Sequence, residues 1–176
     1  LRKSRRLRRG MNPALRTMLL AALLSLAGCA PQTPPAPAVP AKSEAELRRE
    51  QYFGPEIAAD QAIAWRPSNL GIKLLTPGAG PLVQMQDRVR VHYTGRLKDG
   101  TVFDSSRARG KPADYAVDRL ITGWSAAMLA LKPGAKAVIC IPPHLGYGGL
   151  RSGNIPPFSG LVFEVEVIAV NPEPDK

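Results

Sequence analysis

One stretch of the chain, DRVRVHYTGRLKDGTVFDSS at residues 87–106, places a carboxylate beside aromatic side chains in a pattern suited to a binding cleft. Tyr93 lies on the apolar side of an alternating run, and Phe103 is followed directly by Asp104. Such alternation predicts a strand with one buried face, and Asp99-Gly100 is typical of a hairpin turn. An aromatic side chain with a carboxylate next to it at the mouth of a strand predicts a small apolar cleft with one polar group.

Residue types that support other chemistries are few and scattered. His92 and His144 have no clustered cysteine or carboxylate partners, which argues against a metal site. No glycine-rich loop joins a predicted strand to a helix, so nucleotide binding is unsupported and no cofactor is expected. Cys140 lies in the apolar run 137–141, where a buried and inert thiol is favoured over a nucleophile.

Short strands around one amphipathic helix must position these residues. Trp124, Ala127, Met128 and Leu131 recur at helical spacing, and Lys132-Pro133-Gly134 is expected to end that helix. One helix against several antiparallel strands indicates an α+β fold. Apolar alternation and turn residues predict strands at 72–75, 88–97, 101–104, 115–117, 135–141 and 161–170, with loops at 105–112 and 142–160.

The 87–106 stretch and five later blocks together resemble the FKBP-type peptidyl-prolyl cis/trans isomerases. The resemblance covers residues 67–172 and implies a curved antiparallel β-sheet wrapped around one short α-helix. It also implies isomerisation of X-Pro bonds in proline-containing polypeptides and inhibition by macrolides. The five blocks are Leu120-Ile121-Thr122-Gly123-Trp124, Ile141-Pro142-Pro143, Gly146-Tyr147-Gly148, Asn154-Ile155-Pro156-Pro157 and Leu161-Val162-Phe163-Glu164-Val165.

The resemblance gives each pocket residue a role. Trp124 would form the floor beneath the proline ring, and the Tyr147 hydroxyl and Ile121 backbone N–H would donate to substrate carbonyls. Tyr93 or Arg109 would orient Asp104, the one polar group of the pocket. The implied catalytic residues are Asp104, Tyr147, Phe103 and Trp124, and the implied substrate-binding residues are Tyr93, Leu120, Ile121, Ile155, Phe163 and Arg109.

Two positions near the pocket depart from the family pattern. Ala113 stands where many members carry an aromatic residue, and Asn154 replaces a more usual apolar residue before Ile155. These departures bear on substrate preference and macrolide affinity. The alternative function is a non-enzymatic peptide-binding chaperone or interaction module on the same fold, but the intact set of pocket residues favours the isomerase.

The positive charge of the chain is concentrated at its N-terminus. The formal net charge is +10, and residues 1–28 hold seven basic side chains and no acidic one. The remainder carries 17 basic and 14 acidic side chains, which is close to balance. A targeting segment explains the basic run better than nucleic-acid binding does, so no nucleic-acid partner is expected.

The first 42 residues predict a membrane anchor. Met11 is the expected translation start, and the apolar run that follows is shorter than the roughly 20 residues that a membrane-spanning helix needs. Leu26-Ala27-Gly28-Cys29 resembles the bacterial lipoprotein signal, so residues 1–28 are expected to be a signal peptide and Cys29 the lipidated residue. Residues 29–42 would form a Pro-rich tether. The protein would then be anchored in the bacterial cell envelope, at the outer membrane and facing the periplasm.

Residues 43–66 are predicted to form a short N-terminal extension before the isomerase domain. Ser43 and Glu46 have the spacing of a capping box, but too few apolar residues follow for a helix that is stable alone. Tyr52, Phe53 or Trp65 would be available to pack against the domain.

Overall fold

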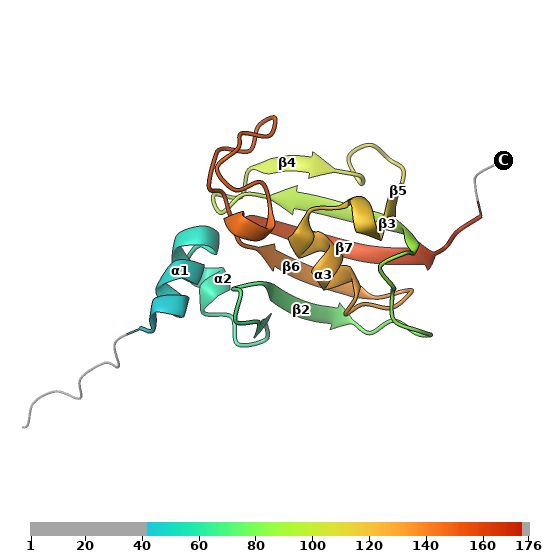
Figure 1. Ribbon diagram of the computed structural model, residues 1–176, viewed down its shortest axis with the longest axis horizontal. Coiled ribbons are helices and arrows are strands. Elements are labelled where there is room, and N and C mark those ends of the chain that lie inside the picture. The colour runs from blue at the N-terminus through green and yellow to red at the C-terminus, as the bar shows by residue number, and fades with distance from the viewer. Residues whose placement is uncertain (1–41, 174–176) are drawn as a thin grey trace, which may run out of the picture. The chain divides into compact units, whose positions relative to one another are not determined.

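The computed structural model describes residues 42–173 (Figure 1). The predicted signal peptide at 1–28, the lipidation site Cys29 and all but the last residue of the tether lie outside the described residues. Between residues 42 and 173, no helix is both long enough and apolar enough to cross a membrane.

An antiparallel sheet forms the body of the domain, and seven strands belong to it within the described residues. The sheet order is β1-β2-β6-β7-β3-β4, and β5 also pairs with β3. The C-terminal strand β7 therefore lies inside the sheet, between β6 and β3. The strands are β1 (Ala64–Trp65), β2 (Gly71–Thr76), β3 (Arg88–Arg96), β4 (Val102–Ser105), β5 (Ala113–Ala116), β6 (Lys136–Ile141) and β7 (Leu161–Val170).

Alternation in the sequence explains how the long strands are buried. In β3, Val89, Val91 and Tyr93 are buried, whereas the residues between them are exposed or only partly buried. The predicted α+β fold is confirmed, and the predicted strands agree with the observed ones within a few residues. The largest shift is at the strand predicted for 115–117, which runs from Ala113 to Ala116 because Val117 begins the 3-10 helix η2 (Val117–Arg119).

The helix α3 (Thr122–Met128) lies across one face of the sheet (Figure 1). Gly123 allows this close approach, because a Cβ at that position would lie 2.4 Å from Cγ2 of Ile141 in β6. The helix ends before Leu131, earlier than predicted. The reason is that the N–H of Leu131 donates to the carbonyl of Met128 at 2.8 Å, a tighter turn than in an α-helix. This turn still directs Leu131 into the core, where it is 1% exposed.

The N-terminal extension packs against the domain and forms two helices, α1 (Glu44–Phe53) and α2 (Pro55–Ala58). Both hydrogen bonds of the predicted capping box between Ser43 and Glu46 are present. Phe53, at the end of α1, is buried in a second apolar cluster with Ile63, Cys140 and Val162. The short helix α1 is therefore stabilised by contacts with β6 and β7 rather than by its own residues alone. A further 3-10 helix, η3 (Pro143–Leu145), follows β6.

Candidate active site

A cavity of about 330 Å³ opens between β3, β4, α3 and the loop that follows β6. We call it the Trp124 cavity. Eight of its ten lining residues are among the side chains for which the sequence predicted a catalytic or binding role. The ten are Tyr93, Phe103, Asp104, Tyr115, Arg119, Leu120, Ile121, Trp124, Tyr147 and Phe163.

Strand pairing brings residues far apart in the sequence to this cavity. Gly95 of β3 pairs with Asp104 of β4 on one side and with Phe163 of β7 on the other. The absence of a side chain at Gly95 leaves room for two aromatic rings, because a Cβ there would lie 2.5 Å from Phe103 and 2.8 Å from Phe163. The cavity wall therefore depends on this glycine.

Aromatic rings packed edge to face form the floor of the cavity. The Trp124 ring lies 5.5 Å from the Phe163 ring and 5.9 Å from the Tyr93 ring, with interplanar angles of 86° and 84°. Phe103 meets Phe163 at 5.4 Å and 89°. Trp124 and Phe163 are 4% and 5% exposed, so their rings are held on nearly all sides. This arrangement gives a rigid apolar surface suited to a small ring such as that of proline.

One carboxylate, Asp104, borders this apolar surface and is held by two donors. The Tyr93 hydroxyl and the Arg109 guanidinium both donate to it. A second guanidinium N–H of Arg109 donates to the Tyr93 oxygen at 2.9 Å. The Tyr93 hydroxyl and the Tyr115 hydroxyl lie 2.9 Å apart. Because Tyr93 uses its one hydroxyl hydrogen in the bond to Asp104, Tyr115 is the donor in this pair. These four side chains form one network that fixes the orientation of the carboxylate.

The same contacts set the protonation states in the network. Partial burial opposes ionisation of Asp104, but the hydrogen bonds from Tyr93 and Arg109 outweigh it and lower the Asp104 pKa below its ordinary value. Burial, together with the hydrogen bond to Asp104, raises the pKa of Tyr93. At neutral pH the cavity thus holds a fixed carboxylate and a neutral phenol, neither of which is poised to exchange a proton.

Two donors at the cavity make no hydrogen bond with any residue between 42 and 173. They are the backbone N–H of Ile121, just before α3, and the hydroxyl of Tyr147 in the loop after η3. Both residues line the cavity, and these donors are available to carbonyl oxygens of a bound chain.

Two predicted site residues lie beside the cavity rather than on its lining. Arg109 reaches it through Asp104 and Tyr93. Ile155 is 4% exposed and lines an adjoining hollow of about 320 Å³, which shares Phe103, Asp104 and Tyr147 with the Trp124 cavity.

Two lining residues, Tyr115 and Arg119, were not predicted from the sequence. Tyr115 contacts both the Tyr93 ring at 6.0 Å and the Trp124 ring at 6.3 Å. It lies two residues after Ala113 in β5, and period-two alternation puts both on one side of the strand. That spacing could have shown that an aromatic ring stands next to the position left small by Ala113. For Arg119, an exposed residue in η2, no comparable signal exists.

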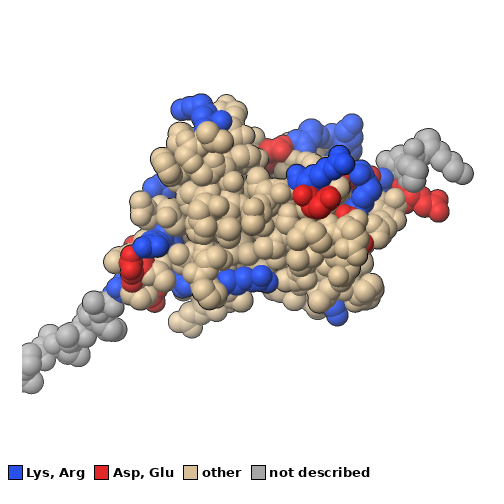
Figure 2. All heavy atoms as spheres, in the orientation of Figure 1, with Lys and Arg blue, Asp and Glu red and all other residues tan. Residues whose placement is uncertain are grey.

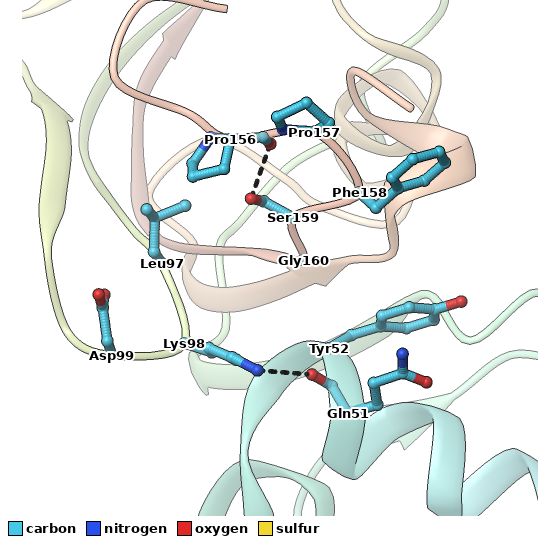
Figure 3. Close-up of a pocket in the computed structure, with 10 residues that line it drawn as sticks. All are labelled: Gln51, Tyr52, Leu97, Lys98, Asp99, Pro156, Pro157, Phe158, Ser159 and Gly160. Carbon is cyan, nitrogen blue, oxygen red and sulfur yellow. Dashed lines mark hydrogen bonds between the residues drawn. The ribbon is translucent and has the colours of Figure 1, made fainter. Parts of the chain in front are cut away.

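A second hollow, of about 300 Å³, lies between the end of α1, the β3–β4 turn and residues 156–160 (Figure 3). Its sides are joined by a hydrogen bond of 3.4 Å from Lys98 Nζ to the Gln51 carbonyl. Phe158, one of the aromatic residues that line it, is 72% exposed and so is not held in place by packing. We take the Trp124 cavity as the candidate active site, because only there does a fixed carboxylate border buried aromatic rings among the described residues.

Comparison with known proteins shows the family to which the chain is similar. Residues 80–168 match the family described as FKBP-type peptidyl-prolyl cis-trans isomerase. A probable FKBP-type peptidyl-prolyl cis-trans isomerase of Haemophilus influenzae is 40% identical over 139 residues, which are 77% of this chain and 58% of that protein. The FKBP-type 22 kDa peptidyl-prolyl cis-trans isomerase of Escherichia coli is 46% identical over 65% of this chain and 56% of its own length. This chain thus spans little more than half of these relatives.

Solved structures give the same result. The peptidyl-prolyl cis-trans isomerase of Pseudomonas syringae has a TM-score of 0.63 and 38% identity, with 75% of this chain and 98% of that chain covered. FkpA of Escherichia coli has a TM-score of 0.66 and 35% identity, with 74% of this chain and 59% of that chain covered.

Proposed function

This chain belongs to the FKBP-type peptidyl-prolyl cis-trans isomerases, and we propose that it catalyses rotation about X-Pro peptide bonds in polypeptides. The observation that carries the proposal is the combination of a rigid aromatic floor around Trp124 with a carboxylate, Asp104, fixed at its edge. The aromatic floor suits a proline ring, and the carboxylate suits the polar amide next to that ring.

Catalysis in this cavity would act on the resonance of the amide. The barrier to peptide rotation is about 18–20 kcal/mol because the C–N bond has partial double-bond character. The planar amide is the more polar form, so a dry cavity stabilises it less than water does. As the amide twists, its carbonyl carbon loses electron density from nitrogen, and the fixed Asp104 carboxylate stabilises that carbon.

Hydrogen bonds to the bound chain would select the twisted geometry. The Ile121 N–H and the Tyr147 hydroxyl donate to the two carbonyls that flank the proline, while Trp124 holds the ring. Only contacts that are stronger in the twisted state accelerate the reaction, and each ~1.4 kcal/mol of such preference gives a tenfold rate increase. No proton is transferred and no covalent intermediate forms.

A protease-free isomerisation assay on short X-Pro peptides tests the proposal. Asp104→Leu should chiefly lower kcat, because its carboxylate acts on the twisted amide. Trp124→Ala should weaken the binding of substrate and of a macrolide inhibitor together, because both would use the aromatic floor. Between about pH 6 and 8, where an essential histidine would titrate, the rate should vary little.

The opposite results are equally clear. A steep pH dependence centred near the ordinary histidine pKa of about 6.5, and abolished by replacing His92 or His144, would establish proton transfer and refute amide twisting. Absence of catalysis on every peptide, with suppression of client aggregation retained, would favour the non-enzymatic chaperone instead.

We also propose that the domain is held at a bacterial membrane facing the periplasm, where its substrates would be envelope proteins. The support is the Leu26-Ala27-Gly28-Cys29 motif and the Pro-rich tether at 29–42. Cys29→Ala should release the protein from the membrane fraction, because firm attachment needs two or more acyl chains. Recovery of the variant wholly in the membrane fraction, with an unchanged intact mass, would refute the anchor.

A further inference from the structure

Some of the arginines around the Trp124 cavity are paired with an acidic side chain, and Arg119 is not paired with any that the structure describes. Arg109 is paired with Asp104, and Arg107 in the same loop is paired with Glu166 at 2.5 Å. Arg119 also lines the cavity, yet among residues 42–173 it has no ion pair and no side-chain hydrogen bond. Its neighbour Asp118 is exposed and forms no ion pair with it. Within the part of the chain that the structure describes, Arg119 is therefore a cation at the cavity without an acidic partner.

The location of Arg119 relates this charge to a bound chain. Arg119 ends η2, two residues before Ile121, whose backbone N–H is available to a substrate carbonyl. Figure 2 shows a face that is mostly uncharged, with basic side chains and some acidic ones gathered beside β5 and the start of α3. A chain whose carbonyl bonds to Ile121 would pass within reach of the long Arg119 side chain, whose planar guanidinium is suited to a carboxylate.

We propose that Arg119 determines specificity, favouring substrates with an acidic side chain directly next to the proline. The inference rests on the proposed isomerase function and adds a substrate class to it. Because Arg119 is exposed, the pair would be partly screened by water, and the preference for glutamate over glutamine should be roughly two- to fivefold in kcat/KM. The effect should lie in KM, because the charge pair does not touch the amide atoms that change on rotation and so binds ground and transition states alike.

The experiment uses two matched series of X-Pro peptides, with Glu, Gln or Lys either before or after the proline. Isomerisation is measured at low salt and at 1 M salt, where the Debye length falls to about 3 Å. The variants are Arg119→Gln, Arg119→Lys and Arg119→Glu. Arg66→Gln is the matched control, since Arg66 is an exposed arginine that does not line the cavity.

The preference for Glu should appear in at least one series and shrink at high salt. It should vanish in Arg119→Gln, persist in Arg119→Lys, reverse toward Lys peptides in Arg119→Glu, and be unchanged in Arg66→Gln. Equal turnover of Glu and Gln peptides by the unaltered protein, or a preference that survives Arg119→Gln, would overturn the inference while the isomerase function stands. Failure to isomerise any peptide would overturn the proposed function and this inference with it.

Discussion

Replacing Gly95 with alanine should damage the candidate active site by displacing an aromatic ring of its wall, although Gly95 itself is not among the lining residues. The added Cβ would lie 2.5 Å from Cζ of Phe103 and 2.8 Å from Cε1 of Phe163. Carbon atoms pack favourably at about 3.5–4.0 Å, so each overlap is close to 1 Å. At least one ring must therefore move.

The surroundings decide which ring moves. Phe163 is 5% exposed and is held edge to face by Trp124 and Phe103, so it has little freedom. Phe103 is only partly buried and borders the Trp124 cavity, so it should swing into that space. Overpacking of this kind typically costs about 1–3 kcal/mol, and the displaced ring would occupy volume that the substrate needs.

Urea denaturation and the isomerisation assay measure the two effects. Gly95→Ala should lower the free energy of unfolding by about 1–3 kcal/mol and also reduce kcat/KM. Phe103→Leu removes the ring atoms nearest the new methyl group, so the double variant should lose less stability than the two single variants added together. A Gly95→Ala protein with unchanged stability and activity, or strict additivity in the double variant, would refute the packing argument.

Three further outcomes are expected. Burial raises the pKa of Cys140 to about 12, so a thiol reagent should label it only after denaturation; rapid labelling of the folded protein would contradict its burial. Phe53→Ala should lower the free energy of unfolding in urea by about 3–5 kcal/mol, and a loss under about 1 kcal/mol would mean that α1 is not part of the cooperative fold. The Asp104 pKa is lower in the folded state than in the unfolded chain, where it is about 3.9. Ionised Asp104 therefore stabilises the folded protein at pH values above about 3.9. This stabilisation is lost as the pH falls through the lower folded pKa. The difference in unfolding free energy between the unaltered protein and Asp104→Asn should therefore be constant above about pH 5 and shrink below about pH 4, whereas a difference that changes between pH 5 and 7 would contradict the lowered pKa.

The long strands could be predicted from the sequence because their burial repeats every second residue. In β3, and in β7 from Phe163 to Val167, buried apolar side chains alternate with charged or polar ones, and the predicted bounds 161–170 for β7 are those observed. The aromatic residues of the cavity other than Tyr115 could be named because the family resemblance supplied their joint order. Neither source depends on knowing which distant segments touch.

Features that depend on tertiary contact could not be predicted in the same way. Helix α1 forms because Phe53 meets Cys140 and Val162, nearly 90 and more than 100 residues further along the chain, and no local pattern records that meeting. The end of α3 was misplaced because the turn at Leu131 keeps the side chain buried while the hydrogen-bonding pattern changes. In the sequence, Arg119 looks like any solvent-exposed arginine. Only its place in the lining of the cavity distinguishes it from other exposed arginines.

The central place of β7 in the sheet has a consequence for the order of folding. Its partners β6 and β3 do not pair with each other, so the sheet stays in two parts until residues 161–170 are available. A chain emerging from a ribosome or a translocation channel would thus acquire its cooperative structure only after residues 161–170 have emerged. Contacts between β3 and β7 close a loop of about 70 residues, which makes folding slow compared with a helical protein of equal size. A chain cut short before Leu161 should therefore fail to fold at all, rather than fold in part.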